Sequence, residues 1–133
     1  MAICYLGLGA NLGQRHLNIR LAVEKIKLLK NTRVLKESKI IQTVPQGGPG
    51  GQPMYLNAAL KISTLFSPLV LLKKLKNIEK GLGRVKTKRF GARVIDLDIL
   101  LYDDRCFCRK ELTIPHPRLF KRDFVLQPLS EVL

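Results

Sequence analysis

Two aspartates separated by one residue are the strongest candidates for chemistry in this 133-residue sequence. Asp96 and Asp98 lie in the segment 94–102, whose alternating apolar residues predict a β-strand. Alternate residues of a strand point to one face and lie roughly 6.6 to 7 Å apart, so both carboxylates face the same way. Two bare charges at ~7 Å repel by about 2.4 kcal/mol at an effective dielectric constant near 20, so we expect a cation nearby. Mg²⁺ suits these hard oxygen ligands; the alternative is a solvated strand face neutralised by Arg93 or a lysine.

A basic segment precedes the acidic pair and changes its interpretation. Five of the ten residues from 84 to 93 are basic and none is acidic, and the absence of a helical apolar stripe predicts a loop. Arg84 and Arg93 can each form paired hydrogen bonds with phosphate oxygens, while Lys86 can add a point charge. Phosphoryl transfer depends mainly on positioning and charge stabilisation, so the combination favours an enzyme. An RNA-binding module would use the basic residues and gain little from the carboxylates.

Three further motifs are less specific. The segment 7–13, Gly-Leu-Gly-Ala-Asn-Leu-Gly, has its third glycine one position late for a dinucleotide-binding loop, and we interpret its glycines as parts of a turn. A zinc site made of Cys106, Cys108 and His116 has weak support, because Cys-x-Cys is followed by only one distant histidine. His116 lies between two prolines, where it either contacts a phosphate or packs in a loop.

Tyr55 and Asn57 lie at the start of another predicted strand, 56–64. Because they are two residues apart, their side chains face the same way. This spacing would offer an aromatic ring for stacking beside an amide that reads the edge of a heterocycle. An ordinary pair of surface side chains explains the same pattern.

The elements that must position these residues follow from the apolar periodicity. The predicted elements are strands at 2–8, 34–43, 56–64 and 94–102, helices at 16–29 and 68–82, a Gly/Pro-rich loop at 45–53 and a mostly irregular tail at 112–133. The order strand, helix, strand, strand, helix, strand predicts an α+β sandwich of the ferredoxin-like βαββαβ type, with helices packed mainly on one face of an antiparallel sheet. This fold occurs in enzymes and in RNA-binding modules, so the function must be argued from the site.

Composition limits the class of protein. The length predicts a single domain over 1–133, and 46% hydrophobic residues are enough for a packed core. No apolar run approaches the ~20 residues of a membrane span, the N-terminal residues lack a secretory pattern, and three cysteines cannot all pair, so we expect a cytoplasmic protein with reduced thiols. The net charge of +14 favours anionic partners, whether nucleic acid, an anionic membrane or a nucleoside triphosphate, and charge alone does not choose among them.

The segment 89–100, Arg-Phe-Gly-Ala-Arg-Val-Ile-Asp-Leu-Asp-Ile-Leu, resembles the 6-hydroxymethyl-7,8-dihydropterin pyrophosphokinases of folate synthesis. The resemblance extends over almost the whole chain through the segments 7–13, 55–58, 78–84, 114–117 and 122–126. It implies a Mg²⁺-dependent transfer of the pyrophosphoryl group of ATP to the hydroxymethyl oxygen of the pterin, releasing AMP, with two Mg²⁺ ions. It also implies a monomer whose partners are these small molecules, without nucleic acid or membrane.

The same resemblance assigns residues to the reaction. Asp96 and Asp98 are expected to bind both ions, Arg84 and Arg93 to hold the transferring phosphates, and 45–53 to form a lid. The residues expected to contact ATP are Arg84, Lys86, Arg93, Ile99, Thr113, His116 and Arg122. The residues expected to contact the pterin are Thr43, Val44, Gln46, Tyr55, Asn57 and Phe124, with the ring between Tyr55 and Phe124. The alternative function is a ferredoxin-like RNA-binding module that uses the basic surface; the scarcity of aromatic residues, 6% of the chain, argues against it.

Overall fold

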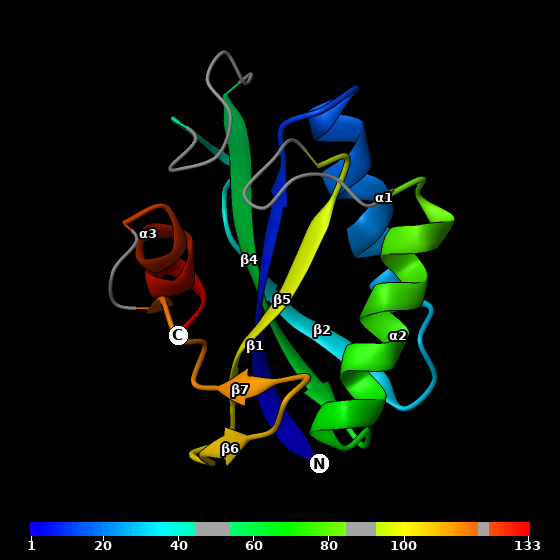
Figure 1. Cartoon of the computed structure of the whole chain (residues 1–133), viewed down its shortest axis with the longest axis vertical. Coiled ribbons are helices and arrows are strands. Elements are labelled where there is room, and N and C mark those ends of the chain that lie inside the picture. The colour runs from blue at the N-terminus through cyan, green and yellow to red at the C-terminus, as the bar shows by residue number, and fades with distance from the viewer. Residues whose placement is uncertain (45–53, 85–92, 120–122) are drawn as a thin grey trace.

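The computed structural model describes residues 1–44, 54–84, 93–119 and 123–133. Across these residues the chain forms one five-stranded sheet, a two-stranded hairpin and three helices (Figure 1). The sheet contains β1 (Ala2–Ala10), β2 (Thr32–Glu37), β3 (Ile41–Thr43), β4 (Tyr55–Thr64) and β5 (Asp96–Tyr102). The other elements are the hairpin strands β6 (Phe107–Cys108) and β7 (Thr113–Ile114) and the helices α1 (Arg15–Lys27), α2 (Pro68–Gly81) and α3 (Asp123–Val132).

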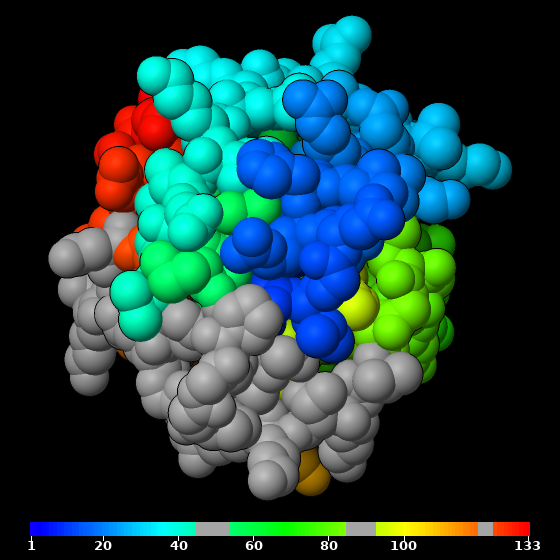
Figure 2. All heavy atoms as spheres, turned by 90° about the horizontal axis from the view of Figure 1, so that it is seen from above, coloured from blue at the N-terminus to red at the C-terminus, as the bar shows by residue number. Residues whose placement is uncertain are grey.

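The sheet confirms the predicted fold class. Its strand order is β2-β4-β1-β5, β3 also pairs with β4, and every pairing is antiparallel. Helices α1 and α2 cover one face of the sheet, and α3 lies on the opposite face (Figure 1). Seen from above, α1 lies between the segment that contains β2 and β3 and helix α2 (Figure 2). This is the ferredoxin-like arrangement with one additional helix on the second face.

The alternation of apolar residues in the central strands produces two cores. Cys4, Leu6 and Leu8 of β1 are buried in the larger core, which α1 and α2 cover. On the other face, Ala59 of β4 and Leu100 of β5 pack in a smaller core with α3. Each strand therefore presents apolar residues to α1 and α2 while its alternate residues face the other way.

The single strand predicted over 34–43 is wrong, because the structure divides this segment into β2 and β3. At the break, the Ser38 backbone N–H donates to the Ala59 carbonyl at 2.9 Å, and the Ser38 hydroxyl accepts the Ala59 N–H at 2.8 Å. A side chain thus replaces one backbone partner of β4, and the regular ladder is interrupted there.

The irregular tail predicted over 112–133 is also wrong, because the tail contains β7 and the helix α3. Pro128 lies inside α3, where it removes one backbone donor. Helical spacing nevertheless brings Leu129 and Val132 together, and they are buried at 4% and 0% exposure. Burial of this apolar face against the sheet outweighs the cost of the proline. No helix in the described ranges has the length and apolar character required to span a bilayer.

Candidate active site

The pairing of three strands gathers the predicted site residues on the face opposite α1 and α2. Gly9 of β1 lies opposite Asn57 of β4 on one side and opposite Asp96 of β5 on the other. Two residues earlier on the same face, Gly7 lies opposite Asp98. The two glycines therefore form a floor without side chains between the amide and the carboxylates.

This floor corrects the sequence-based interpretation of the segment 7–13. Gly7 and Gly9 belong to β1 rather than to a turn, whereas Gly13 has a φ of +68° and lies in the turn before α1. A Cβ at Gly9 would lie 3.1 Å from Asn57 Oδ1, closer than most real contacts. The absence of side chains at Gly7 and Gly9 leaves open space for the site on this face of the strand.

The two aspartates lie as the alternation predicts. Asp96 and Asp98 are partly exposed on β5, with the buried Leu97 between them pointing into the larger core. Both carboxylates line each of two cavities of about 330 Å³. The acidic pair therefore marks the place where the two cavities meet.

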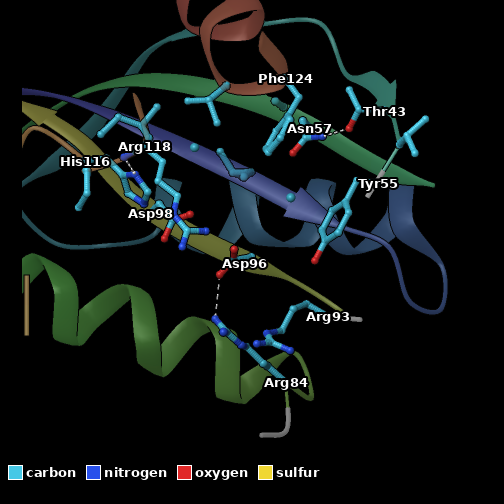
Figure 3. Close-up of a pocket in the computed structure, with 18 residues that line it drawn as sticks. Thr43, Tyr55, Asn57, Arg84, Arg93, Asp96, Asp98, His116, Arg118 and Phe124 are labelled. Atoms are coloured by element: carbon cyan, nitrogen blue, oxygen red, sulfur yellow. Dashed lines mark hydrogen bonds and ion pairs between the residues drawn. The ribbon is translucent and has the colours of Figure 1, made fainter. Parts of the chain in front are cut away.

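Arg84 lies between two carboxylates at the end of α2. One of its guanidinium nitrogens is 2.5 Å from Glu79 Oε2 and 3.0 Å from Asp96 Oδ1. Burial alone would lower the pKa of Arg84, but the charges of Asp96 and Glu79 outweigh it and raise this pKa above its ordinary value. Arg84 is consequently a fixed positive charge at the junction of the cavities (Figure 3).

Glu79 was assigned no role from sequence, although it is buried at 6% exposure. Its Oε2 accepts the Leu97 backbone N–H at 2.7 Å as well as the Arg84 guanidinium. Burial raises the pKa of Glu79, and the bond from Leu97 and the charge of Arg84 offset part of that increase.

One end of the first cavity is suited to a flat polar ring. The residues from the predicted pterin set that line it are Thr43, Val44, Tyr55, Asn57 and Phe124. The Asn57 amide nitrogen donates to Thr43 Oγ1 at 2.7 Å, which fixes the orientation of the amide (Figure 3). Asn57 is buried at 7% exposure, so its position is determined by the sheet and by Thr43.

The second cavity gathers residues from the predicted ATP set. Its lining includes Arg84, Ile99, Thr113 and His116 from four different elements or connections. Arg93 lines the first cavity only, and His116 lines both.

The first cavity is also lined by Arg118, which the sequence analysis missed and which Figure 3 shows extending toward Asp98. Arg118 belongs to no sequence motif, and its position directly after Pro115-His116-Pro117 is the one local signal for it.

Arg93 is held through its backbone by a fully buried asparagine. Asn11 Oδ1 accepts the Arg93 N–H at 2.8 Å, and the Asn11 and Leu12 N–H groups donate to the Arg93 carbonyl at 3.0 and 3.1 Å. The start of the turn after β1 therefore anchors the residue that precedes the acidic strand. The sequence predicts a structural turn in the segment 7–13 but gives no sign that this turn binds the Arg93 backbone.

Several predicted site residues cannot be located. Gln46, Lys86 and Arg122 lie outside the described residues, as do the predicted lid at 45–53 and most of the basic loop.

The donor atoms suit Mg²⁺ better than zinc. Among described residues there is no group of three or more Cys, His, Asp and Glu side chains able to hold a metal, so the zinc site of Cys106, Cys108 and His116 is wrong. All three cysteines are free thiols. The two carboxylates that the described part of the chain offers fit Mg²⁺, which usually keeps several waters and takes its remaining ligands from substrate phosphates.

Comparisons with known proteins agree on one family. Residues 5–133 match the family model described as 7,8-dihydro-6-hydroxymethylpterin-pyrophosphokinase. A relative from Haemophilus influenzae, named 2-amino-4-hydroxy-6-hydroxymethyldihydropteridine pyrophosphokinase, is 42% identical over 132 residues, covering 99% of this chain and 82% of its own length. A protein of the same name from Bacillus subtilis is 40% identical over 130 residues, covering 98% and 77%.

A solved structure supports the fold. The structure titled as an HPPK-DHPS in complex with substrates aligns with a TM-score of 0.71 and 14% identity, covering 98% of this chain and 40% of that one. At this identity the likeness concerns the fold alone.

Proposed function

The chain belongs to the 7,8-dihydro-6-hydroxymethylpterin-pyrophosphokinase family, and on this premise we propose that its two adjoining cavities bind ATP and the pterin on either side of Asp96 and Asp98. The enzyme transfers pyrophosphate from ATP to the hydroxymethyl group of 6-hydroxymethyl-7,8-dihydropterin, giving the pterin diphosphate and AMP in folate biosynthesis. The observation that supports this placement is that both cavities share Arg84, Asp96, Asp98 and His116 in their linings.

Asp96 and Asp98 are proposed to hold two Mg²⁺ ions together with ATP oxygens. When bound, the ions would neutralise the charge that develops on the transferring phosphates. In the structure Asp96 pairs with Arg84, so this carboxylate is already balanced by a cation before any substrate enters. A cation bound at Asp96 would either share this carboxylate with Arg84 or displace the arginine from it.

The arginines are proposed to hold and stabilise the transferring group. Arg84 extends into both cavities and Arg93 into the first, so each can donate to phosphate oxygens from a different direction. Ile99, Thr113 and His116 would bind the remaining nucleotide, and we propose that Lys86 and Arg122 join them. Such contacts raise the rate when they strengthen as negative charge shifts in the transition state.

The pterin is proposed to stack between Tyr55 and Phe124 in the first cavity. Asn57 would hydrogen-bond to the polar edge of the ring, while Thr43 keeps the amide in one orientation and Val44 closes the end. Gln46, outside the described residues, is proposed to add a further contact. A ring held in this way directs its hydroxymethyl group toward the carboxylate junction, where an oriented attack on ATP gains from proximity.

Nothing in the comparisons supports the alternative of an RNA-binding module. We further propose that 1–133 acts as a monomeric single-domain enzyme in the cytoplasm.

Amide substitutions at the acidic pair test the proposal. Asp96→Asn and Asp98→Asn should each lower the rate of AMP formation from ATP and the pterin by more than about 100-fold, because an amide is a much weaker ligand for Mg²⁺ than a carboxylate. Asp104→Asn, an exposed aspartate in the turn after β5, is the matched control and should retain the rate. Thermal unfolding should show that all three variants remain folded. Full turnover in folded Asp96→Asn and Asp98→Asn would reject the metal-binding role.

A further inference from the structure

The buried carboxylate of Glu79 has no place in the transfer described above. It lies near the end of α2 and is shielded from solvent, and its Oε2 receives two hydrogen bonds. Placing a carboxylate in the interior costs several kcal/mol unless charge and hydrogen-bond partners compensate. Both partners, the Arg84 guanidinium and the Leu97 backbone N–H, belong to the segments that flank the reaction site.

Arg84 is shared by two carboxylates that differ in exposure. The Glu79 side chain is 7% exposed and the Asp96 side chain is 37% exposed, yet both contact the same guanidinium nitrogen. A cation bound at Asp96 would compete with Arg84 for this carboxylate, either sharing its oxygens or displacing the arginine. Although Glu79 also lines the second cavity, its Oε2 is directed at Arg84 and at the backbone of β5.

We propose that Glu79 is a positioning residue that retains Arg84 at the junction of the cavities when Asp96 turns to a divalent cation. This inference rests on the proposed roles of Arg84 and Asp96. The backbone reinforces the arrangement, since the Arg84 N–H donates to the Glu79 carbonyl at 3.0 Å. Residue 79 thus holds both the main chain and the side chain of Arg84.

The same carboxylate also ties the arginine to the acidic strand. Leu97, whose N–H reaches Glu79 at 2.7 Å, lies between Asp96 and Asp98. One side chain therefore sets the separation between the cationic group that meets the phosphates and the strand that carries the metal ligands. A shift of this side chain would displace the two groups relative to each other, which reaction geometry tolerates poorly.

The variant Glu79→Gln separates the charge from the hydrogen bond. Glutamine keeps an oxygen that can accept the Leu97 N–H, but it loses the ion pair with Arg84. We expect kcat/KM to fall roughly 10- to 100-fold, the usual effect of removing a group that orients a binding or catalytic residue. Glu24→Gln is the matched control, because Glu24 is an exposed glutamate of α1 that pairs with Lys27, and it should retain wild-type kinetics.

A double-mutant cycle with Arg84→Ala decides whether Glu79 acts through the arginine. If it does, Glu79→Gln lowers kcat/KM strongly in the wild-type background and by less than about threefold in the Arg84→Ala background. An equal loss in both backgrounds, or no loss in the wild-type background, overturns the inference. Full activity of Arg84→Ala would instead reject the proposed role of Arg84, so the two failures are distinguishable.

A spectroscopic measurement in the Asp96→Asn background provides a second readout, because this substitution removes the charge of the other carboxylate that pairs with Arg84. The guanidinium NMR signal of Arg84, assigned with Arg84→Lys, should report restricted rotation in Asp96→Asn and faster rotation when Glu79→Gln is added. Unchanged rotation overturns the inference. If Glu79→Gln does not fold, Glu79→Asp keeps the charge but withdraws it by one methylene, and it should show the same dependence on Arg84. Wild-type kinetics and unchanged Arg84 rotation in a folded Glu79→Asp would likewise reject the positioning role.

Discussion

Replacing Gly9 with alanine tests whether the bare backbone of β1 is part of the pterin site. An added Cβ would lie 3.1 Å from Asn57 Oδ1 and 3.6 Å from Tyr55 Cδ1. Asn57 cannot withdraw easily, because its amide nitrogen is bound to Thr43 Oγ1 at 2.7 Å and its side chain is buried. The methyl group must therefore shift the amide by a few tenths of an ångström or occupy space that the ring needs.

The expected loss of pterin affinity follows from the hydrogen bond that the Asn57 amide is proposed to make with the ring. A buried polar group left without its partner costs about 1–3 kcal/mol, which corresponds to a roughly 5- to 150-fold weaker affinity for the pterin. Stability should change little, because the close contact with Asn57 opposes the gain of about 0.4–1 kcal/mol that alanine brings at an extended strand position through the unfolded chain. Weaker binding without lower stability identifies a local steric effect.

Calorimetric titration of the pterin into protein saturated with a non-hydrolysable ATP analogue measures the affinity, and thermal unfolding measures stability. Gly7→Ala is the matched control, because its Cβ would meet the flexible end of Leu100 at 3.4 Å rather than the amide. It should weaken pterin binding much less. Wild-type pterin affinity in Gly9→Ala, or equal weakening in the two variants, would refute the idea that this glycine keeps the ring site open.

Three further outcomes follow from the same structure. Arg93→Ala should lower kcat more than it weakens ATP binding, and equal losses in stopped-flow and titration experiments would indicate simple anchoring of the ground state. Asn11→Ala should cost about 1–3 kcal/mol in urea unfolding, because the Arg93 N–H loses its acceptor, whereas Asn77→Ala on the exposed side of α2 should stay within about 0.5 kcal/mol. Burial, with a smaller effect of Asp103, raises the pKa of Cys4 from 9.0 to about 12. The unfolded chain therefore loses this proton first, and stability should fall above about pH 9 by up to about 1.4 kcal/mol per pH unit. Urea unfolding at several alkaline pH values measures this slope, which Cys4→Ala should reduce; an unchanged slope would contradict the assignment.

Local periodicity was sufficient to predict the main elements of the fold. The alternation in β1, β4 and β5 and the helical spacing in α1 and α2 depend on the separation of polar from apolar residues, which is visible within each segment. The break at Ser38 was not predictable, because it depends on hydrogen bonds to Ala59 in a different strand. The helix α3 was missed because Pro128 suggested irregular structure, while the apolar surface that stabilises α3 exists only after the sheet has formed.

The same distinction applies to the site. Alternation alone placed Asp96 beside Asp98, and strand pairing confirms that they share a face with Asn57. Glu79 and Asn11 were not identified as site residues, because their partners Leu97 and Arg93 are 18 and 82 residues away in the sequence. Residues that contact a ligand therefore leave a local pattern, whereas residues that hold them in place are recognised only through tertiary contacts.

Charge balance explains why carboxylates belong in a cavity that binds an anion. Among the described residues, Arg84, Arg93 and Arg118 line the first cavity with Asp96 and Asp98, and Glu79 contributes a third negative charge beneath Arg84. These six formal charges cancel, and the second cavity adds Lys76, Lys110 and Glu111 to its lining. The described linings of the two cavities together therefore carry one excess positive charge, far less than a triphosphate with roughly four negative charges at neutral pH requires. Direct electrostatic binding of ATP by a cluster of cations would be stronger if the acidic residues were absent. Their presence is advantageous only if cations lie between them and the phosphates, and two divalent ions would supply about the charge that the triphosphate requires. Under the proposed function, the paired aspartates would make nucleotide binding depend on metal, and the arginines would respond to the charge that moves during transfer.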